Sequence, residues 1–203
     1  MHMESHIPEQ QEGSKMDIHA QTEFDSTAAA KEYYLVAKNK LMEVYRWYEV
    51  CEVPVSTFML TDRTGNEVKR WVQEGDYLKI DIPGPGTSTG DGYDWVKVES
   101  IKEESSPDTE VTSITVRPAS NPKNLDASTA HFFEDSATST FQVKRIGTTV
   151  HAEVHGRNEK ANTDTDQVMD NVRNTLVGWS AKLGLSFPQW KSLVNGLVKT
   201  EEA

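Results

Sequence analysis

Three polar residues at alternate positions could together bind a metal ion. His151, Glu153 and His155 follow one another at intervals of two, and on a β-strand such residues point to the same face. Imidazole and carboxylate groups are ligands that divalent transition metals accept, and His131 could add a further one. One alternative is therefore a metal-dependent enzyme. Apolar residues occupy the positions between them, so a strand with one solvated face explains the same alternation without a metal.

A second candidate site is aromatic. Trp71, Tyr93 and Trp95 lie in a region with a β pattern and could form a groove beside a proline- and glycine-rich loop. Such a groove would suit a small ligand or an extended peptide, because pockets of this kind are lined mainly by aromatic and apolar side chains. The competing interpretation is that the three rings belong to the hydrophobic core.

The glycine-rich segment 82–95 has the composition of a nucleotide-binding loop but lacks the cation that phosphate requires. Its charged residues are Asp91 and Asp94, so it would repel an anion, and we expect it to join two antiparallel strands. Cys51 lies in an apolar stripe, as buried thiols do, and there is no Gly-x-Ser-x-Gly motif. We therefore expect no cofactor and favour a protein that is not an enzyme.

Charge and composition exclude several classes of partner. The 203 residues carry a formal net charge of −11, concentrated in segments 1–25 and 99–110, and include one cysteine. No cluster of Lys and Arg favours nucleic acid, and no apolar run is long enough for a membrane span. The first residues also lack the pattern of a secretory signal. These features predict a soluble cytoplasmic protein with no nucleic-acid or membrane contact.

The N-terminal part is predicted to be a flexible acidic arm followed by a helix. Residues 1–24 are polar and show no clear periodicity. From Asp25 or Ser26, either of which can cap a helix, apolar residues recur every three or four positions as far as Cys51. We expect this helix to give way to a strand near residues 44–47, because β-branched and aromatic residues follow.

Short strands with tight turns are predicted next. The expected strands cover residues 55–61, 67–73, 77–82, 94–102 and 111–117. The stretches Gly75-Asp76-Tyr77-Leu78-Lys79-Ile80 and Asp94-Trp95-Val96-Lys97-Val98 would be neighbours, and this arrangement resembles an SH3-like barrel. The resemblance implies a small antiparallel barrel and names no ligand, because such barrels serve many unrelated roles.

The C-terminal part is predicted to be a β-hairpin followed by two helices. We expect strands over 139–146 and 148–155 and helices over 164–183 and 186–198. Gly147 would form the hairpin turn, and capping patterns mark both helix starts. Gly178 and Gly196 interrupt the helices, which indicates that each helix packs closely on a neighbour.

These patterns predict an α+β protein. A small antiparallel β barrel-like (SH3-like) module would be preceded by an N-terminal helix and followed by a β-hairpin and a C-terminal αα-hairpin. The predicted units are 1–24, the flexible acidic arm; 25–118, the helix and barrel-like module; and 119–203, the hairpin and helices. Because no catalytic group of residues stands out, we favour a non-enzymatic protein that binds a protein partner or assembles with itself. A metal-dependent enzyme and a small-ligand-binding protein are the alternatives.

Overall fold

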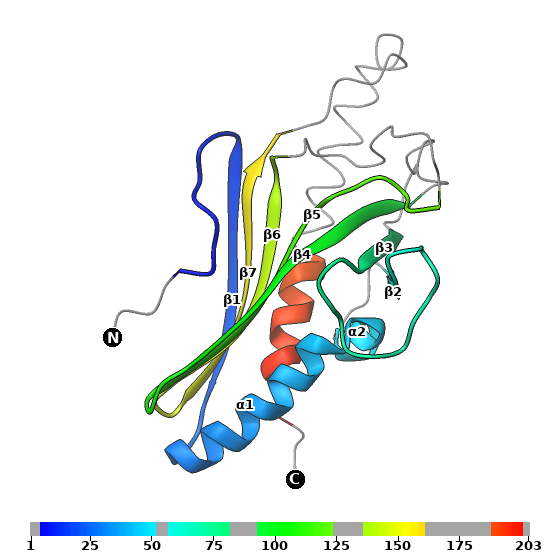
Figure 1. Ribbon diagram of the computed structural model, residues 1–203. Helices are drawn as coiled ribbons and strands as arrows, with labels where there is room; N and C mark the ends of the chain where they lie inside the picture. Colours follow the sequence, from blue (N-terminus) through cyan, green and yellow to red (C-terminus); the bar gives the residue numbers. More distant parts are fainter. Residues whose placement is uncertain (1–4, 52–56, 82–92, 124–135, 161–187, 201–203) are drawn as a thin grey trace.

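The computed structural model shows one antiparallel sheet with helices packed on it (Figure 1). It describes residues 5–51, 57–81, 93–123, 136–160 and 188–200. The strands are β1 (Ser14–Glu23), β2 (Thr57–Thr61), β3 (Tyr77–Asp81), β4 (Asp94–Ser105), β5 (Thr109–Pro118), β6 (Thr138–Ile146) and β7 (Thr149–Glu159). The helical elements are α1 (Thr27–Met42), the 3-10 turn η1 (Val44–Arg46), α2 (Trp47–Val50) and a C-terminal helix over residues 188–198.

The strand order overturns the predicted SH3-like barrel. The described strands form a 7-stranded sheet in the order β1-β7-β6-β5-β4-β3-β2, so the sheet is open and β1 and β2 are its edges. β3 and β4 are antiparallel neighbours, as predicted. However, β5 pairs with β6 along most of its length, so strands assigned to two separate units belong to one sheet. The protein is an α+β protein with an open antiparallel sheet.

Residues 67–73 do not form the return strand that the sequence indicated. Their ladder contact with β2 is the single bridge between Thr61 and Glu67. Beyond it, the guanidinium of Arg70 donates two hydrogen bonds, of 2.6 and 2.9 Å, to the buried carboxylate of Asp76. This bidentate contact holds the chain in a turn, and β3 takes the place beside β2.

The predicted flexible arm is wrong for residues 14–23, because they form β1. β1 pairs with β7 from Ser14 opposite Glu159 to Glu23 opposite Thr149, and Ile18 is buried in the core. His6 is buried as well, with its Nδ1 2.8 Å from Ser113 Oγ. The second half of the acidic N-terminal segment is therefore part of the sheet.

The first helix begins where the sequence predicted, but the chain that follows it differs from the prediction. Ser26 caps α1 by accepting a hydrogen bond from the Ala29 amide. The helix ends at Met42, but the chain then forms η1 and α2 instead of a strand. The reason is the Trp47 side chain, whose Nε1–H donates to the Leu41 carbonyl oxygen at 3.1 Å and anchors this turn in the core.

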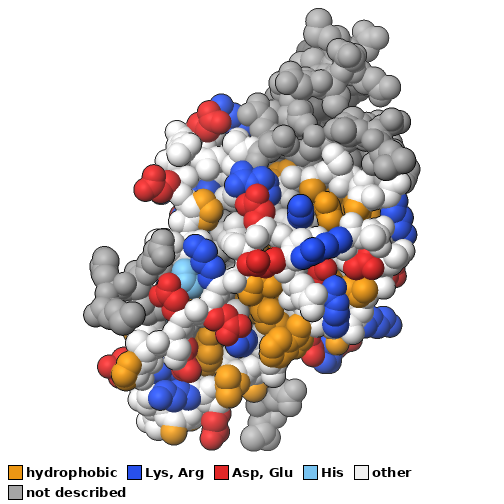
Figure 2. All heavy atoms as spheres, viewed as in Figure 1, with side chains coloured by type: hydrophobic (Ala, Val, Ile, Leu, Met, Phe, Trp, Pro, Cys, Tyr) orange, Lys and Arg blue, Asp and Glu red, His pale blue; other side chains and the backbone are white. Residues whose placement is uncertain are grey.

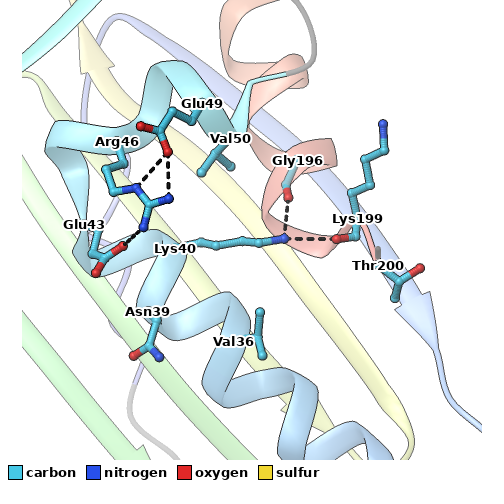
Figure 3. Close-up of a pocket in the computed structure, with 10 residues that line it drawn as sticks. All are labelled: Val36, Asn39, Lys40, Glu43, Arg46, Glu49, Val50, Gly196, Lys199 and Thr200. Atoms are coloured by element: carbon cyan, nitrogen blue, oxygen red, sulfur yellow. Dashed lines mark hydrogen bonds and ion pairs between the residues drawn. The ribbon is translucent and has the colours of Figure 1, made fainter. Parts of the chain in front are cut away.

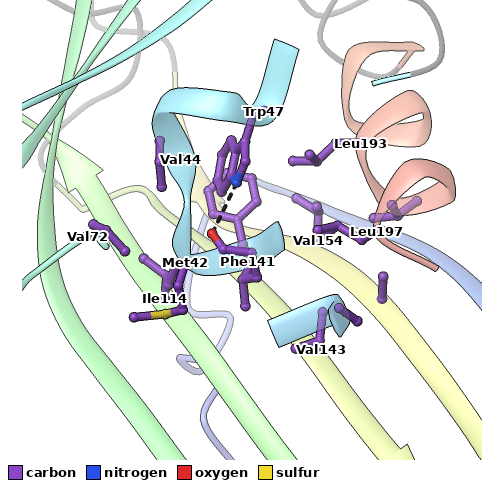
Figure 4. Close-up of a cluster of buried hydrophobic side chains, with 14 of the residues drawn as sticks. Met42, Val44, Trp47, Val72, Ile114, Phe141, Val143, Val154, Leu193 and Leu197 are labelled. Carbon is purple, nitrogen blue, oxygen red and sulfur yellow. Dashed lines mark hydrogen bonds between the residues drawn. The ribbon is translucent and has the colours of Figure 1, made fainter. Parts of the chain in front are cut away.

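The helices cover one face of the sheet, which we call the inner face; the opposite face is the outer face. Trp47 is fully buried there (Figure 4), with its ring centroid 4.9 Å from that of Phe141 and 5.5 Å from that of Phe58. Trp190 of the C-terminal helix lies 5.1 Å from Phe141. Aromatic side chains in tilted and edge-to-face contact contribute both large buried area and favourable ring contacts, so this cluster holds the helices on the sheet.

The C-terminal half confirms two further predictions. β6 and β7 form a hairpin that turns at Gly147, whose φ of 59° suits glycine. Residues 188–198 are helical, with Pro188 in the first turn. The predicted helix over 164–183, the glycine-rich segment 82–92, and His131 lie outside the described residues.

The surface carries both signs of charge. In Figure 2, Lys and Arg side chains are interspersed with Asp and Glu, and hydrophobic side chains gather in one area in the lower half of the view. The exposed large hydrophobic residues include Leu35 and Val36 of α1, at 56% and 44% exposure. None of the described helices is both long and apolar enough to cross a lipid bilayer.

Candidate functional site

A pocket of about 300 Å³ lies beside β2, β3 and β4. Two of the three predicted ligand-binding residues, Tyr93 and Trp95, line it. The described lining residues are Thr61, Gly65, Asn66, Glu67, Lys79, Tyr93, Trp95, Asn121 and Lys123. The structure thus brings these aromatic rings together with polar and cationic groups that are distant in sequence.

The strand register places the pocket on the outer face of the sheet. Lys79 of β3 is paired directly with Trp95 of β4, so the two side chains share a face. The residues that alternate with Lys79, namely Leu78 and Ile80, belong to the core cluster under the helices. The pocket and the core therefore lie on opposite sides of the same strands.

Lys79 and Tyr93 form a close cation–π contact. The Lys79 Nζ lies 3.8 Å from the centroid of the Tyr93 ring, well inside the range of about 6 Å over which a ring attracts a cation. Both side chains are half-buried. The contact fixes the ammonium group at the pocket wall.

Trp95 is buried without an acceptor for its N–H group. The residue is 3% exposed but is absent from the main core cluster that the described residues form. Its Nε1 has no hydrogen-bond partner among the described residues. A buried donor left unpaired costs about 1–3 kcal/mol, and native proteins leave few such groups. This donor is thus an unexplained polar group in a side chain that lines a pocket.

The cations that line the pocket are not neutralised by carboxylates of the described residues. Among the described residues, neither Lys79 nor Lys123 forms an ion pair. The acidic residue in the described lining is Glu67, which is exposed. The pocket therefore has a local excess of positive charge in a chain whose formal net charge is −11.

A rigid turn forms one wall. The Asp62 carboxylate accepts hydrogen bonds from the Thr64 and Asn66 amides at 2.9 and 3.0 Å. It also accepts one from the Thr64 hydroxyl at 2.7 Å, which is the largest cause of the lowered pKa of Asp62. Gly65 has φ +80°, and a Cβ there would lie 2.8 Å from Cγ of Lys123. The predicted turn over residues 62–66 is confirmed, and it packs against the Lys123 side chain.

The third predicted aromatic residue lies elsewhere. Trp71 is 45% exposed, and its ring is 6.0 Å from the Lys38 Nζ of α1, so it does not share the pocket. Sequence reasoning missed Lys79, Asn121 and Lys123. Lys79 could have been found from its place in a strand predicted to neighbour Trp95, whereas no local signal distinguishes the other two, which come from an irregular connection.

The three predicted metal ligands do lie on one face of β7, but two of them, Glu153 and His155, belong to an ion-pair network. The two ring nitrogens of His155 lie 2.6 Å from Asp17 and 3.1 Å from Glu153. The Glu153 carboxylate also forms an ion pair with Lys144 at 2.6 Å and accepts a hydrogen bond from the Gln142 amide at 3.0 Å. Among the described residues, no three His, Cys, Asp or Glu side chains are grouped to hold a metal. The metal site stays a prediction that this geometry does not favour.

The same network perturbs the titration of its members. Burial alone would raise the pKa of Glu153, but hydrogen bonds from His155 and Lys144 lower it to about 2. Burial is also the largest cause of the lowered pKa of His151, followed by the charge of Lys144. The ionic contacts thus account for the lowered pKa of Glu153, whereas burial is the main cause for His151.

Cys51 is a core thiol, as the sequence indicated. It is buried, and the Gln189 side-chain amide donates to its sulfur at 3.1 Å. Burial raises the pKa of Cys51 to about 11, so the thiolate form is scarce near neutral pH. This environment argues against a nucleophilic role.

A second hollow, of about 750 Å³, lies between α1, α2 and the end of the C-terminal helix (Figure 3). Its cations are engaged by the protein. Lys40 donates to the carbonyl oxygens of Gly196 and Lys199 at 3.2 and 3.0 Å, and Arg46 pairs with Glu43 and Glu49. These contacts tie the helices together, so we regard this hollow as structural.

Comparisons with known proteins assign no family. No protein-family model matches the chain, and no curated protein matches it. A hypothetical protein, jhp0584 from Helicobacter pylori, aligns with 10% identity and a TM-score of 0.47, over 89% of this chain and 86% of that one. The di-domain ARO/CYC BexL of the BE-7585A biosynthetic pathway aligns with 13% identity and a TM-score of 0.38, over 93% of this chain and 51% of that one. Ara h 8.0201 aligns with 11% identity and a TM-score of 0.35, over 92% of this chain and 100% of that one. These likenesses are distant, and the fold of this chain follows from its own strand order.

Proposed function

We propose that this protein binds a small molecule in the pocket beside β2, β3 and β4. The observation that carries the proposal is the buried Trp95 side chain, which lines the pocket and whose Nε1–H has no acceptor among the described residues. A ligand that brings an acceptor would relieve the cost of this unpaired donor.

The size and lining of the pocket support the same proposal. About 300 Å³ is at the lower end of the range for small-molecule pockets, roughly 300–1,000 Å³. Aromatic rings from Tyr93 and Trp95 lie beside polar groups such as Thr61 and Asn121, the usual combination of apolar contact and directional hydrogen bonds.

The proposal is tested by following the indole N–H signals in NMR spectra of ¹⁵N-labelled full-length protein. The chain has five Trp, and Trp95→Phe assigns the signal of interest. We expect at least one member of a panel of small anionic, neutral and cationic molecules (fragments) to shift the Trp95 signal until the shift saturates. The signal of the core residue Trp47 should stay unchanged. A panel in which no fragment moves the Trp95 signal would contradict the proposal.

A pair of blocking variants locates the binding. Asn66 is exposed and lines the pocket, whereas Lys69 is exposed and does not. Asn66→Phe should weaken binding by filling the rim, and Lys69→Phe should leave it unchanged. Equal effects of both variants would place the ligand elsewhere.

Self-assembly or binding to a protein partner stays a second candidate, and one observation favours it: the exposure of Leu35 and Val36 on α1. A free acidic arm no longer supports it, because β1 is paired with β7. Light scattering of the full chain and of a Leu35→Lys, Val36→Lys double variant tests it. A wild-type monomer would remove the self-assembly form of this candidate.

A further inference from the structure

We infer that the ligand of the Tyr93–Trp95 pocket is a small organic carboxylate, an inference that rests on the proposed function. Three residues that line the pocket carry a donor with no acceptor among the described residues: Trp95, through its buried indole N–H, and Lys79 and Lys123, through their ammonium groups. A ligand complementary to such a set accepts hydrogen bonds and carries negative charge.

The charge of the whole chain makes this local arrangement informative. With a formal net charge of −11, the protein as a whole repels anions. Its other cations commonly pair with carboxylates; for example, Lys144 pairs with Glu153. Two lysines at one pocket have no such partner among the described residues, so the pocket is a place where an anion can gain from a favourable field.

The positions of the donors suit a carboxylate. Lys79 is directly opposite Trp95 across the β3–β4 ladder, where paired residues have Cα atoms about 4.5–5.5 Å apart. Lys123 approaches from the turn at Gly65, which provides a second side. An ionised carboxylate has two oxygens with about four acceptor positions, so it can accept from an ammonium group and from an indole N–H at the same time.

Partial burial strengthens the attraction. Lys79 is half-buried against the Tyr93 ring, so water screens its charge less than that of a fully exposed lysine. The Tyr93 and Trp95 rings can contact the apolar body of the ligand. The pocket of Figure 3 offers a contrast, because its Lys40 and Arg46 are bonded to protein oxygens.

Matched pairs of probes test the inference on the full-length protein. Benzoate is compared with benzamide, and indole-3-acetate with indole-3-acetamide, by titration against the Trp95 indole signal. Each pair differs in charge and little in shape. The carboxylates should bind about tenfold more tightly than the amides, a difference of about 1.4 kcal/mol, because a hydrogen bond between charged groups is stronger than one to a neutral amide.

Three lysine variants locate the effect. Lys79→Met and Lys123→Met should each weaken carboxylate binding about tenfold and leave amide binding unchanged. Lys97→Met is the matched control: Lys97 also lies near a tyrosine ring, 6.0 Å from Tyr77, but does not line the pocket. In the wild-type protein, added salt should weaken binding of the carboxylates and not of the amides, a test that needs no variant to fold.

The outcomes separate this inference from the proposed function. If amides bind as tightly as carboxylates, or if only neutral or cationic fragments move the Trp95 signal, the carboxylate inference is wrong and ligand binding stands. Equal weakening of both probes in the lysine variants would also contradict it, because the lysines would then act by packing. If no fragment of any charge moves the signal, both proposals fail.

Discussion

Gly196 of the C-terminal helix lies directly against Val50 of α2, so closely that a Cβ at Gly196 would be 1.8 Å from the Val50 carbonyl oxygen. The Val50 side chain is near as well, with Cγ1 3.0 Å from the same position. The sequence indicated close helix packing at this glycine, and the contact confirms it. Because the obstructing atom belongs to the backbone, a rotamer change cannot relieve the contact.

Gly196→Ala should therefore destabilise the protein even though alanine favours helix by about 1 kcal/mol over glycine. Forcing the two backbones apart should lower the free energy of unfolding by about 2 kcal/mol net, within the range for overpacked cores. Urea unfolding measures this value. Asn195→Ala, on the same helix at a half-buried position, is the control and should change little. A Gly196→Ala variant as stable as the wild type would show that the helices are not in contact here.

Arg145 provides a second test, because its side chain is fully buried. It donates to Glu110 at 2.6 Å and to the carbonyl oxygens of Gly147 and Pro107 at 2.7 and 3.2 Å. Arg145→Met would leave Glu110 and both carbonyls without this donor, and breaking such a buried pair costs about 3–5 kcal/mol. The free energy of unfolding, measured with urea, should fall by about that amount.

The matched control for Arg145 is Arg117. Its ion pair with Glu99 is half-exposed on both sides, at 35% and 37%. Exposed ion pairs contribute at most about 1 kcal/mol, so Arg117→Met should be mild. Similar losses for the two variants would mean that burial does not determine the value of these ion pairs.

Local sequence signals predicted individual helices and strands well, but they predicted poorly which strands pair with each other in the sheet. The Ser26 cap and the apolar stripe located α1, and alternation located β6, β7 and their turn at Gly147. Alternation states which face a residue occupies, but not which strand lies beside it. Whether β5 ends a barrel or pairs with β6 depends on contacts between segments that are distant in sequence. This is why an open sheet was predicted as a barrel and a hairpin.

β1 was missed for a different reason. Met16, Ile18 and Ala20 alternate along a mostly polar segment, and they face the core side of the sheet. The signal is short, and the acidic surroundings masked it. At the pocket, residue type alone singled out Tyr93 and Trp95. Lys79 and Lys123 could not be found in this way, because strand pairing places Lys79 at the pocket and packing against the turn at Gly65 places Lys123 there.

The pH dependence of stability should depend on Glu153. Its pKa in the folded protein is about 2, below its ordinary value of 4.5, so the folded state binds fewer protons than the unfolded state between these values. The ionised carboxylate thus stabilises the protein fully above about pH 5, and this contribution is lost as pH falls towards 2. The two pKa values correspond to a contribution on the order of 3 kcal/mol.

Glu153→Gln should remove that pH-dependent contribution. Urea unfolding at a series of pH values should show a wild-type protein that loses stability on acidification more steeply than the variant. Lys144→Met should reproduce part of the effect, because Lys144 pairs with Glu153 at 2.6 Å. Parallel pH profiles for the wild type and Glu153→Gln would show that the network does not hold Glu153 ionised.

The last prediction distinguishes a built-in strand from a flexible arm. Ile18 is 3% exposed and packs in the core, whereas its neighbour His19 is exposed on the outer face. Ile18→Ala should cost about 2–5 kcal/mol, and His19→Ala should stay within about 0.5 kcal/mol of the wild type. A chain that lacks residues 1–23 would also expose the β7 edge, so we expect it to associate through that edge. If Ile18→Ala is neutral and the shortened chain is a stable monomer, β1 contributes nothing to the fold and the flexible-arm prediction was correct.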